Sequence, residues 1–162
     1  MRFAGSIPAK LDVKGRVFFP AAFRKLLSAT DNEFVLKRDV YASCLVVYPR
    51  AAWSAEVEDL RSRLNLWNPQ EAMLFRQFMA DAELFALDGN GRFLIPRRLL
   101  DWAGIERELT FVGVDDRVEL WNSRRAAQPF LPAEEYAAAM ERAMRGSTYH
   151  SPDSLSASGR KQ

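Results

Sequence analysis

Two arginines occupy matching places in a ten-residue motif that occurs twice in this 162-residue chain. The first copy, LDVKGRVFFP, begins at Leu11, and the second, LDGNGRFLIP, begins at Leu87. Leu, Asp, Gly, Arg and Pro recur in the same order and spacing, and the arginines are Arg16 and Arg92. A guanidinium group offers parallel N–H donors that fit a phosphate or the edge of a guanine. The chemistry that the motif suggests is therefore recognition of a nucleic acid.

The other polar residues of the motif have structural explanations. Gly15 and Gly91 can adopt the positive φ that most side chains avoid. Asp12 and Asp88 can accept hydrogen bonds from the N–H groups of a turn. A turn of this kind does not require an arginine. Two interpretations of the arginines therefore stay open: an ion pair with the aspartate of the same motif, or a side chain that projects to meet a partner.

Charge is distributed unevenly along the chain, although the formal net charge is only +2. The first 30 residues contain one acidic residue and six basic ones, which are Arg2, Lys10, Lys14, Arg16, Arg24 and Lys25. A local basic surface of this kind can bind a polyanion. An ordinary solvated surface would look the same by charge alone. The second motif has neutral Asn90 where the first has a lysine, so the two loops are alike in shape and unlike in charge.

Strands and short helices must hold the two motifs in place. In each copy apolar residues flank the polar turn, which predicts two strands joined by a loop. The proline that ends each motif, Pro20 or Pro96, predicts the first turn of a short helix. Two more strand-like runs follow in each copy, and the last one ends at Tyr48 or Trp121. A unit this small buries too little surface to be very stable alone. We therefore expect the two copies to pack together and exchange strands.

Helical patterns lie between and after the copies. Apolar residues recur at helical spacing from Trp53 to Leu64, and Asn68 before a proline predicts the start of a second helix that ends near Asp81. We expect the apolar faces of these helices to belong to the core. The predicted organisation is a first repeat (1–50), a helical connector (51–81), a second repeat (82–124), a C-terminal helix (125–146) and a flexible tail (147–162).

The composition argues against several classes of protein. The single cysteine, Cys44, cannot form an intramolecular disulfide, and its apolar neighbours predict a buried structural thiol. The chain shows no signal-peptide pattern and no apolar run of membrane-spanning length, so we expect a soluble, intracellular protein. We expect no catalytic, metal or cofactor site. The one histidine, His150, lies in the polar tail, and no carboxylate pair has the spacing of metal ligands.

The order of LDVKGRVFFP, CLVVYP, a tryptophan-containing helix, LDGNGRFLIP, FVG and VELW resembles the MraZ family of bacterial transcriptional regulators. The resemblance covers residues 1–121. It implies an α+β fold of two tandem AbrB-like swapped-hairpin β-barrel repeats with connecting and C-terminal helices. It also implies a ring-shaped homo-oligomer, an octamer or dodecamer, located in the cytoplasm and on the nucleoid.

The same resemblance implies a function and a set of contact residues. The expected function is binding to short direct repeats in double-stranded DNA upstream of the division and cell-wall gene cluster, with repression of the regulator's own gene. The DNA-contacting residues of the family correspond here to Lys14, Arg16 and Arg92. Lys10 and Arg24 belong to the same basic segment, and we include them in the expected DNA-binding surface.

Two alternatives stay open. An antitoxin of the AbrB-like type would resemble a single copy with a long disordered tail that wraps a toxin, whereas this chain has two copies and a short tail. An oligomeric scaffold without a DNA function would explain the apolar helices, but it would not explain two loop arginines and a basic segment. The salt dependence of binding to duplex DNA distinguishes a DNA-binding protein from a scaffold.

Overall fold

The computed structural model describes residues 2–125 and 130–146. They fall into two units, one within residues 1–126 and one within residues 127–162. The strands are β1 (Phe3–Lys10), β2 (Arg16–Phe18), β3 (Phe34–Arg38), β4 (Leu45–Pro49), β5 (Glu83–Phe85), β6 (Arg92–Leu94), β7 (Glu108–Asp115) and β8 (Arg117–Asn122). The helices are α1 (Ala21–Arg24), α2 (Arg50–Arg63), α3 (Pro69–Ala80), α4 (Arg97–Ala103) and α5 (Ala133–Gly146), with a 3-10 turn at Ser123–Arg125. The predicted flexible tail and His150 lie outside the described residues.

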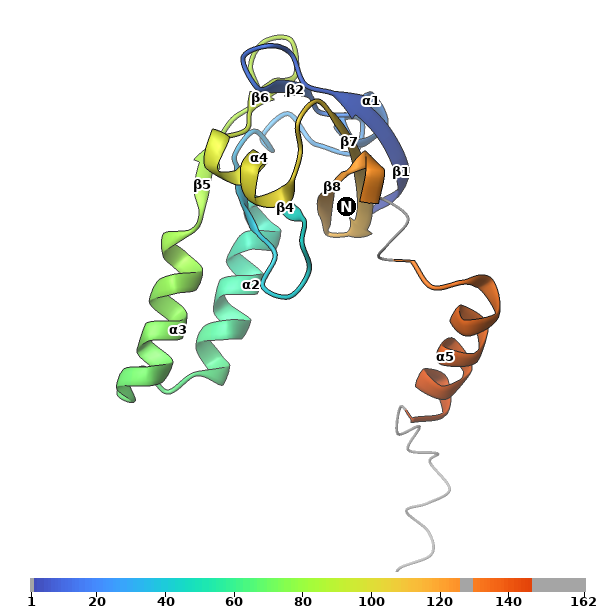
Figure 1. Ribbon diagram of the computed structural model, residues 1–162. Coiled ribbons are helices and arrows are strands. Elements are labelled where there is room, and N and C mark those ends of the chain that lie inside the picture. Colours follow the sequence, from blue (N-terminus) through green and yellow to red (C-terminus); the bar gives the residue numbers. More distant parts are fainter. Residues whose placement is uncertain (1, 126–129, 147–162) are drawn as a thin grey trace, which may run out of the picture. The chain divides into compact units, whose positions relative to one another are not determined.

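Strands from the two sequence copies are interleaved in the first unit (Figure 1). The larger sheet has the order β1-β7-β8-β4-β3-β5, and β2 pairs with β6 in a second, two-stranded sheet. All pairs are antiparallel, with Ser6 opposite Val112 between β1 and β7 and Phe34 opposite Phe85 between β3 and β5. The leading strands of each copy thus pair with the other copy, and the predicted exchange of strands is confirmed.

The larger sheet is open, because β1 and β5 form its edges. The predicted α+β class and the antiparallel sheets are therefore present, whereas the described residues contain no closed barrel. The reason lies in strand length. β2 and β6 have three residues each and pair only with each other, so they do not bridge the edges of the larger sheet.

Phe19 lies at the centre of the main core. Its side chain is 1% exposed, and it directly follows β2. Five other aromatic rings lie with their centroids 5.8–6.4 Å from its own, namely Phe3, Phe23, Phe34, Phe93 and Phe111. They come from both copies, so one core stabilises both repeated motifs. Truncating a phenylalanine in such a position typically costs about 3–5 kcal/mol.

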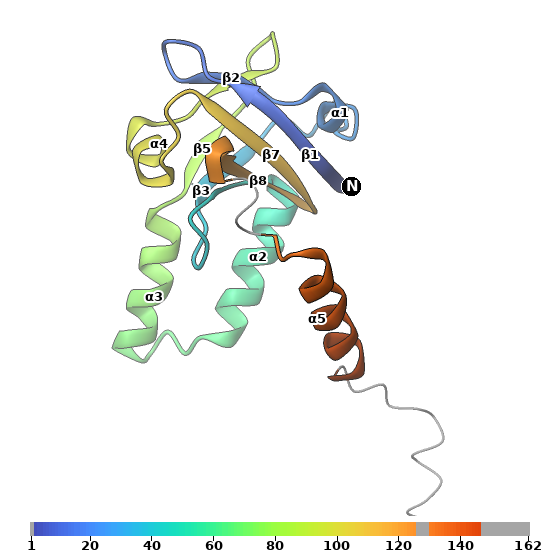
Figure 2. The ribbon, with the colours of Figure 1, turned by 45° about the vertical axis from the view of Figure 1, so that its right-hand side comes forward.

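The connector forms the two predicted helices, α2 and α3, which extend away from the repeated loops (Figures 1 and 2). Asn68 caps α3 as predicted, because its Oδ1 accepts hydrogen bonds from the N–H groups of the second and third helical residues at 2.9 and 3.3 Å. The expectation that the apolar faces belong to the core is wrong for the single chain. Neither helix has a buried residue, and Met73 and Leu74 are 59% and 56% exposed.

The reason is that only part of the helical pair reaches the sheet. Trp53 packs edge-on against Tyr48, which precedes α2, with the ring centroids 5.4 Å apart. Trp53 also stacks on Phe78 near the end of α3, with 5.5 Å between centroids and nearly parallel rings. The turns farther from the sheet, including the junction at Trp67, which is 95% exposed, have no sheet beneath them.

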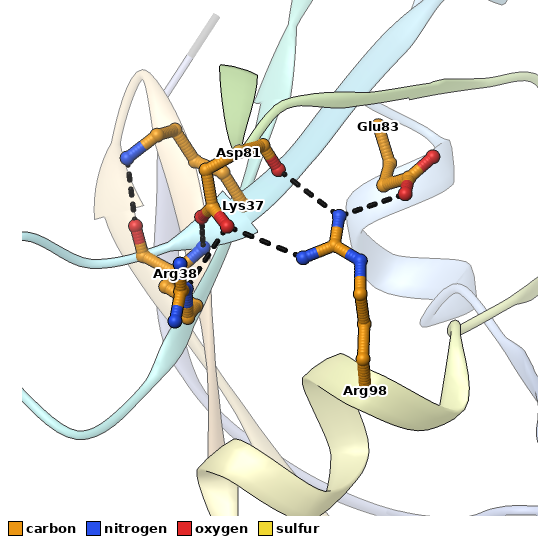
Figure 3. A network of polar contacts seen from close by, with 5 residues as sticks. All are labelled: Lys37, Arg38, Asp81, Glu83 and Arg98. Carbon is orange, nitrogen blue, oxygen red and sulfur yellow. Dashed lines mark hydrogen bonds and ion pairs between the residues drawn. The ribbon is translucent and has the colours of Figure 1, made fainter. Parts of the chain in front are cut away.

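A polar network around Asp81 fixes the connector to both copies (Figure 3). Its buried carboxylate accepts hydrogen bonds from the backbone N–H and Nε of Arg38, both at 2.9 Å, and from Nη1 of Arg98 at 3.2 Å. Arg98 also donates to Glu83 at 2.7 Å, and Lys37 Nζ donates to the carbonyl oxygen of Arg38 at 2.8 Å. One carboxylate thus joins the end of β3 in the first copy to α4 in the second.

Two further predictions concern burial and membranes. Cys44 is fully buried beside β4, and its predicted burial is confirmed. Among the described residues, every helix is too short or too polar to cross a bilayer. The C-terminal helix was predicted over residues 125–146, whereas α5 spans Ala133–Gly146. Its apolar residues Tyr136 and Met140 are 55% and 42% exposed.

Candidate nucleic-acid interface

The first repeated loop, residues 12–16, is closed by hydrogen bonds to Asp12. The Asp12 N–H donates to the carbonyl oxygen of Arg16 at 2.8 Å, and the Gly15 N–H donates to the carbonyl oxygen of Asp12 at 3.1 Å. Oδ1 of Asp12 accepts from the N–H groups of Lys14 and Arg16, both at 2.9 Å. Gly15 has φ 84°, which explains why a glycine stands there.

The second loop, residues 88–92, repeats this geometry. Asp88 N–H donates to the carbonyl oxygen of Arg92 at 2.8 Å, and Oδ1 of Asp88 accepts from the N–H groups of Asn90 and Arg92 at 2.9 Å each. Gly91 has φ 79°. The structural roles predicted for the two aspartates and the two glycines agree with these contacts.

Each arginine forms an ion pair with the aspartate of its own loop. Nε of Arg16 donates to Oδ2 of Asp12 at 2.7 Å, and Nε of Arg92 donates to Oδ2 of Asp88 at 3.0 Å. Within the described residues, the η nitrogens of both arginines donate to no other group. The ion pair therefore orients each guanidinium and leaves its outer donors available, so the two interpretations left open by the sequence are compatible.

The pKa values of both aspartates reflect this geometry. The pKa of Asp12 lies below its ordinary value chiefly because the carboxylate accepts the Arg16 backbone N–H, and the Arg16 guanidinium contributes in the same direction. The pKa of Asp88 is lowered in the same way by the backbone N–H of Arg92. Both carboxylates are consequently ionised at neutral pH and hold the arginines in place.

The two loops are joined to each other at one end of the first unit (Figures 1 and 2). β2 and β6 pair antiparallel with Val17 opposite Phe93. Beyond that pair, Phe19 N–H donates to the carbonyl oxygen of Gly91 at 2.9 Å, and the N–H of the residue after Leu94 donates to the carbonyl oxygen of Gly15 at 3.0 Å. The contacts are reciprocal, so the two loops form one rigid unit.

Arginines and apolar residues share the outer face of this two-stranded sheet. Val17 and Phe93 point into the core, so their neighbours on each strand point outward. Arg16 lies opposite Leu94, and Phe18 lies opposite Arg92. Phe18 and Leu94 are each 56% exposed, and the Arg92 guanidinium lies 5.8 Å from the centre of the Phe18 ring. The sequence analysis missed both apolar residues, although the alternation along each strand could have indicated them.

The remaining basic residues of the expected surface differ in their surroundings. Lys14 and Arg24 are exposed and form no ion pair within the described residues. Arg24 lies against Gly91, so a side chain from the first copy reaches the second loop. Lys10 is 3.9 Å from Glu108, and both side chains are largely exposed, which makes this a weak contact. The structure thus brings Arg16, Arg92 and Arg24 to the same pair of loops.

A different cluster, outside these loops, has the donor types of a metal site. Asp39, Cys44 and Glu119 each place one ligand atom within 4.8 Å of the others. Pairing between β4 and β8 brings Cys44 and Glu119 together although they are far apart in the sequence. The spacing argument, which predicted no metal ligands, could not have found this group.

Comparison with known proteins identifies relatives over most of the chain. The family described as "MraZ protein, putative antitoxin-like" matches residues 3–77 and again 78–141. The transcriptional regulator MraZ of Phocaeicola vulgatus is 47% identical over 145 residues, which are 89% of this chain and 94% of that protein. The protein of the same name from Bacteroides thetaiotaomicron is 46% identical over 145 residues, with 89% and 93% covered.

A more distant relative shows the same correspondence. The transcriptional regulator MraZ of Alkalilimnicola ehrlichii is 37% identical over 122 residues, 75% of this chain and 81% of that protein. Each of the two family matches contains one copy of the Asp–Gly–Arg loop described above. The two joined loops, the two tandem matches and the relatives together show that this chain belongs to the MraZ family.

Proposed function

We propose that this chain is a transcriptional regulator that binds short direct repeats in double-stranded DNA. It represses its own gene, upstream of the division and cell-wall gene cluster, and acts in the cytoplasm on the nucleoid. The names of the relatives support the general function. The observation that carries the proposal is the orientation of the loop arginines, because Asp12 and Asp88 each hold a guanidinium through Nε alone.

The proposed contacts follow from the donors that remain. Arg16 and Arg92 direct their η nitrogens to guanine edges or phosphates, which accept paired N–H donors. Lys14 is a mobile point charge at the exposed tip of the first loop and suits a phosphate. Lys10 and Arg24 add phosphate contacts beside it. A preoriented arginine loses less conformational freedom on binding than a free one, so the ion pairs favour specific recognition.

Assembly into a ring of eight or twelve copies completes the proposal. The single chain exposes apolar side chains on the helical connector and on the edge strand β5, where Leu84 is 82% exposed. Exposed apolar surface and an open sheet edge favour association with further copies. A ring would present several loop pairs to successive repeats, and the combined binding would exceed that of one pair by avidity.

The test is a binding titration on the DNA that lies upstream of the chain's own gene. The probe is compared with the same fragment carrying scrambled repeats, at several salt concentrations. We expect tighter binding to the intact fragment and a linear fall of log affinity with log salt, as displacement of phosphate counterions requires. Equal binding to both fragments, or binding that ignores salt, would refute specific recognition of DNA.

The description of the matched family favours an antitoxin as the second candidate. That function requires a protein partner whose activity this chain blocks. DNA binding alone does not exclude this second candidate. The distinguishing measurement is growth of the host when the gene is deleted alone and when it is deleted together with its chromosomal neighbours. If the chain is only a transcriptional regulator, deleting its gene alone should not make the product of a neighbouring gene lethal to the host.

A further inference from the structure

Asp39, Cys44 and Glu119 form a compact group beside the loop that connects β3 and β4. That loop lies at the end of the unit away from the repeated loops (Figures 1 and 2). The group contains two carboxylates and one thiol, with one ligand atom of each within 4.8 Å of the other two. Asp39 and Cys44 belong to the first copy, whereas Glu119 lies on β8 of the second, opposite Val46 of β4.

The sulfur of Cys44 is buried and lacks a partner. The residue is 0% exposed, and no hydrogen bond reaches its sulfur within the described part of the chain. Burial raises the pKa of the Cys44 thiol, and the carboxylates of Glu119 and Asp39 raise it further. The thiol belongs to an apolar cluster with Val35, Val46 and Trp121, and one ligand atom of each of the two carboxylates also lies within 4.8 Å of it.

Hydrogen bonds orient both carboxylates and leave one oxygen of each unused. Oδ2 of Asp39 accepts from the N–H groups of Tyr41 and Ala42 at 2.9 and 2.7 Å. Oε1 of Glu119 accepts from Nε1 of Trp121 at 3.1 Å. Oδ1 of Asp39 and Oε2 of Glu119 accept no hydrogen bond from the residues that the structure describes. Metal-ligating carboxylates are commonly oriented by such outer hydrogen bonds.

Neighbouring cations form their direct contacts elsewhere. Arg117, on the same strand as Glu119, pairs with Glu56 and Asp116 at 2.8 Å each. Neither Asp39 nor Glu119 forms an ion pair within the described residues. Lys37 and Arg117 interact with Asp39 and Glu119 only at longer range, so the group keeps negative charge that no direct ion pair neutralises. A bound cation would supply that neutralisation.

We propose that Asp39, Cys44 and Glu119 bind a thiophilic divalent cation of the zinc class, with water at the remaining position. Cysteine and carboxylate ligands suit zinc in a four-coordinate site, whereas magnesium and calcium prefer oxygen ligands alone. The thiol releases its proton to solvent as its sulfur binds the metal. The cation then links the β3–β4 loop of the first copy to β8 of the second. This proposal does not depend on DNA binding.

The test is a titration of the untagged, chelator-treated full chain with cobalt, which reports thiolate coordination by a charge-transfer absorption band in the near ultraviolet. We expect a saturable band with one cobalt per chain that zinc abolishes, and a higher melting temperature with zinc. Cys44→Ala should remove the band. Glu119→Gln keeps the side-chain shape and should weaken cobalt binding by about 10-fold or more. Glu106→Gln, which alters an exposed carboxylate outside the cluster, is the matched control.

Circular dichroism of each variant establishes that the fold is retained before the titrations are compared. No charge-transfer band in folded wild type at saturating cobalt would overturn the proposal. A band of unchanged strength in Cys44→Ala would also overturn it, because the metal would then lie elsewhere. If Glu119→Gln raises the melting temperature and wild type binds no cobalt, the two carboxylates share a proton and hold no metal.

Discussion

The guanidinium of Arg24 lies against Gly91, in the space that a β-carbon on residue 91 would occupy. Arg24 ends the short helix after the first motif, and Gly91 belongs to the loop of the second. The contact therefore ties a basic side chain of one copy to the backbone of the other. A side chain at residue 91 would meet Arg24 and would also have to adopt φ 79°.

Gly91→Ala is expected to lower the free energy of unfolding by on the order of 1–3 kcal/mol, because alanine at positive φ is strained. Gly15→Ala is the matched comparison, since φ is 84° there but the nearest atom to a new β-carbon is a carbonyl oxygen at 3.4 Å. Denaturant unfolding of both variants measures the difference. Adding Arg24→Ala to Gly91→Ala should restore the part of the unfolding free energy that the clash with Arg24 removes. Adding Arg24→Ala to Gly15→Ala should restore none of it. Equal stability of Gly91→Ala and wild type would contradict the prediction.

The stability of the fold at low pH should depend on the two loop aspartates, Asp12 and Asp88. The folded-state pKa of Asp12 and that of Asp88 lie below the ordinary value of 3.8. A lowered pKa stabilises the fold above the unfolded value, and this contribution disappears as the pH falls below 3.8 through the folded-state pKa. Asp12→Asn and Asp88→Asn should therefore melt at lower temperature than wild type at neutral pH, and the difference should vanish in strong acid. Melting curves that differ equally at every pH would argue against an electrostatic origin.

Asp81→Asn is expected to destabilise the fold by roughly 2–3 kcal/mol, because a buried carboxylate that holds two arginines is removed. The arginine side chains are 40% and 48% exposed, so solvent moderates the loss. Glu83→Gln is the control, since among the described residues Glu83 pairs only with Arg98 and both side chains are partly exposed. Urea unfolding of both variants should give a clearly larger loss for Asp81→Asn. A loss no greater than that of Glu83→Gln would mean that the network contributes little.

The sequence predicted the repeated loops well because local chemistry determines them. Asp12, Gly15 and their counterparts close their turns within five residues, and Asn68 caps its helix through neighbours in the chain. The contact of Arg24 with Gly91 and the group around Cys44 depend on strand order, which no local pattern reveals. The connector helices were predicted to be buried because their apolar residues recur at helical spacing. This periodicity indicates a hydrophobic face but does not show which surface covers it.

Assembly can be tested through those connector helices. We expect a homo-oligomer larger than a dimer at micromolar concentration, because the single chain leaves Trp67, Met73 and Leu74 exposed. Multi-angle light scattering measures the mass, and a value near 18.5 kDa, the mass of one chain, would contradict the prediction. Leu74→Ser changes an exposed helical residue and should reduce the mass if the connector forms the contact. Thr30→Ala, at an exposed position outside the connector, should leave it unchanged.

Arg16→Ala is expected to abolish specific DNA binding, whereas Arg92→Ala should weaken it less. The asymmetry follows from charge. Residues 1–30 have six basic residues and one acidic residue, while residues 77–106 have three basic and five acidic ones. The structure adds that Arg97 and Arg98 of the second copy pair with acidic neighbours, whereas Lys14 forms no ion pair within the described residues. DNA should therefore approach the first loop more closely than the second.

The loss of binding free energy, and whether it depends on the DNA sequence, distinguishes base recognition from phosphate contact. A bidentate arginine–base contact is worth on the order of 1–3 kcal/mol, and avidity in a ring multiplies its loss. Arg16→Lys keeps the charge but not the paired donors, so it should lose preference for intact over scrambled repeats while retaining salt-dependent binding. Lys14→Ala should weaken both DNAs equally and reduce the salt slope by about one for each contact removed. If a folded Arg16→Ala variant binds intact repeats as tightly as wild type, the first loop does not read the sequence.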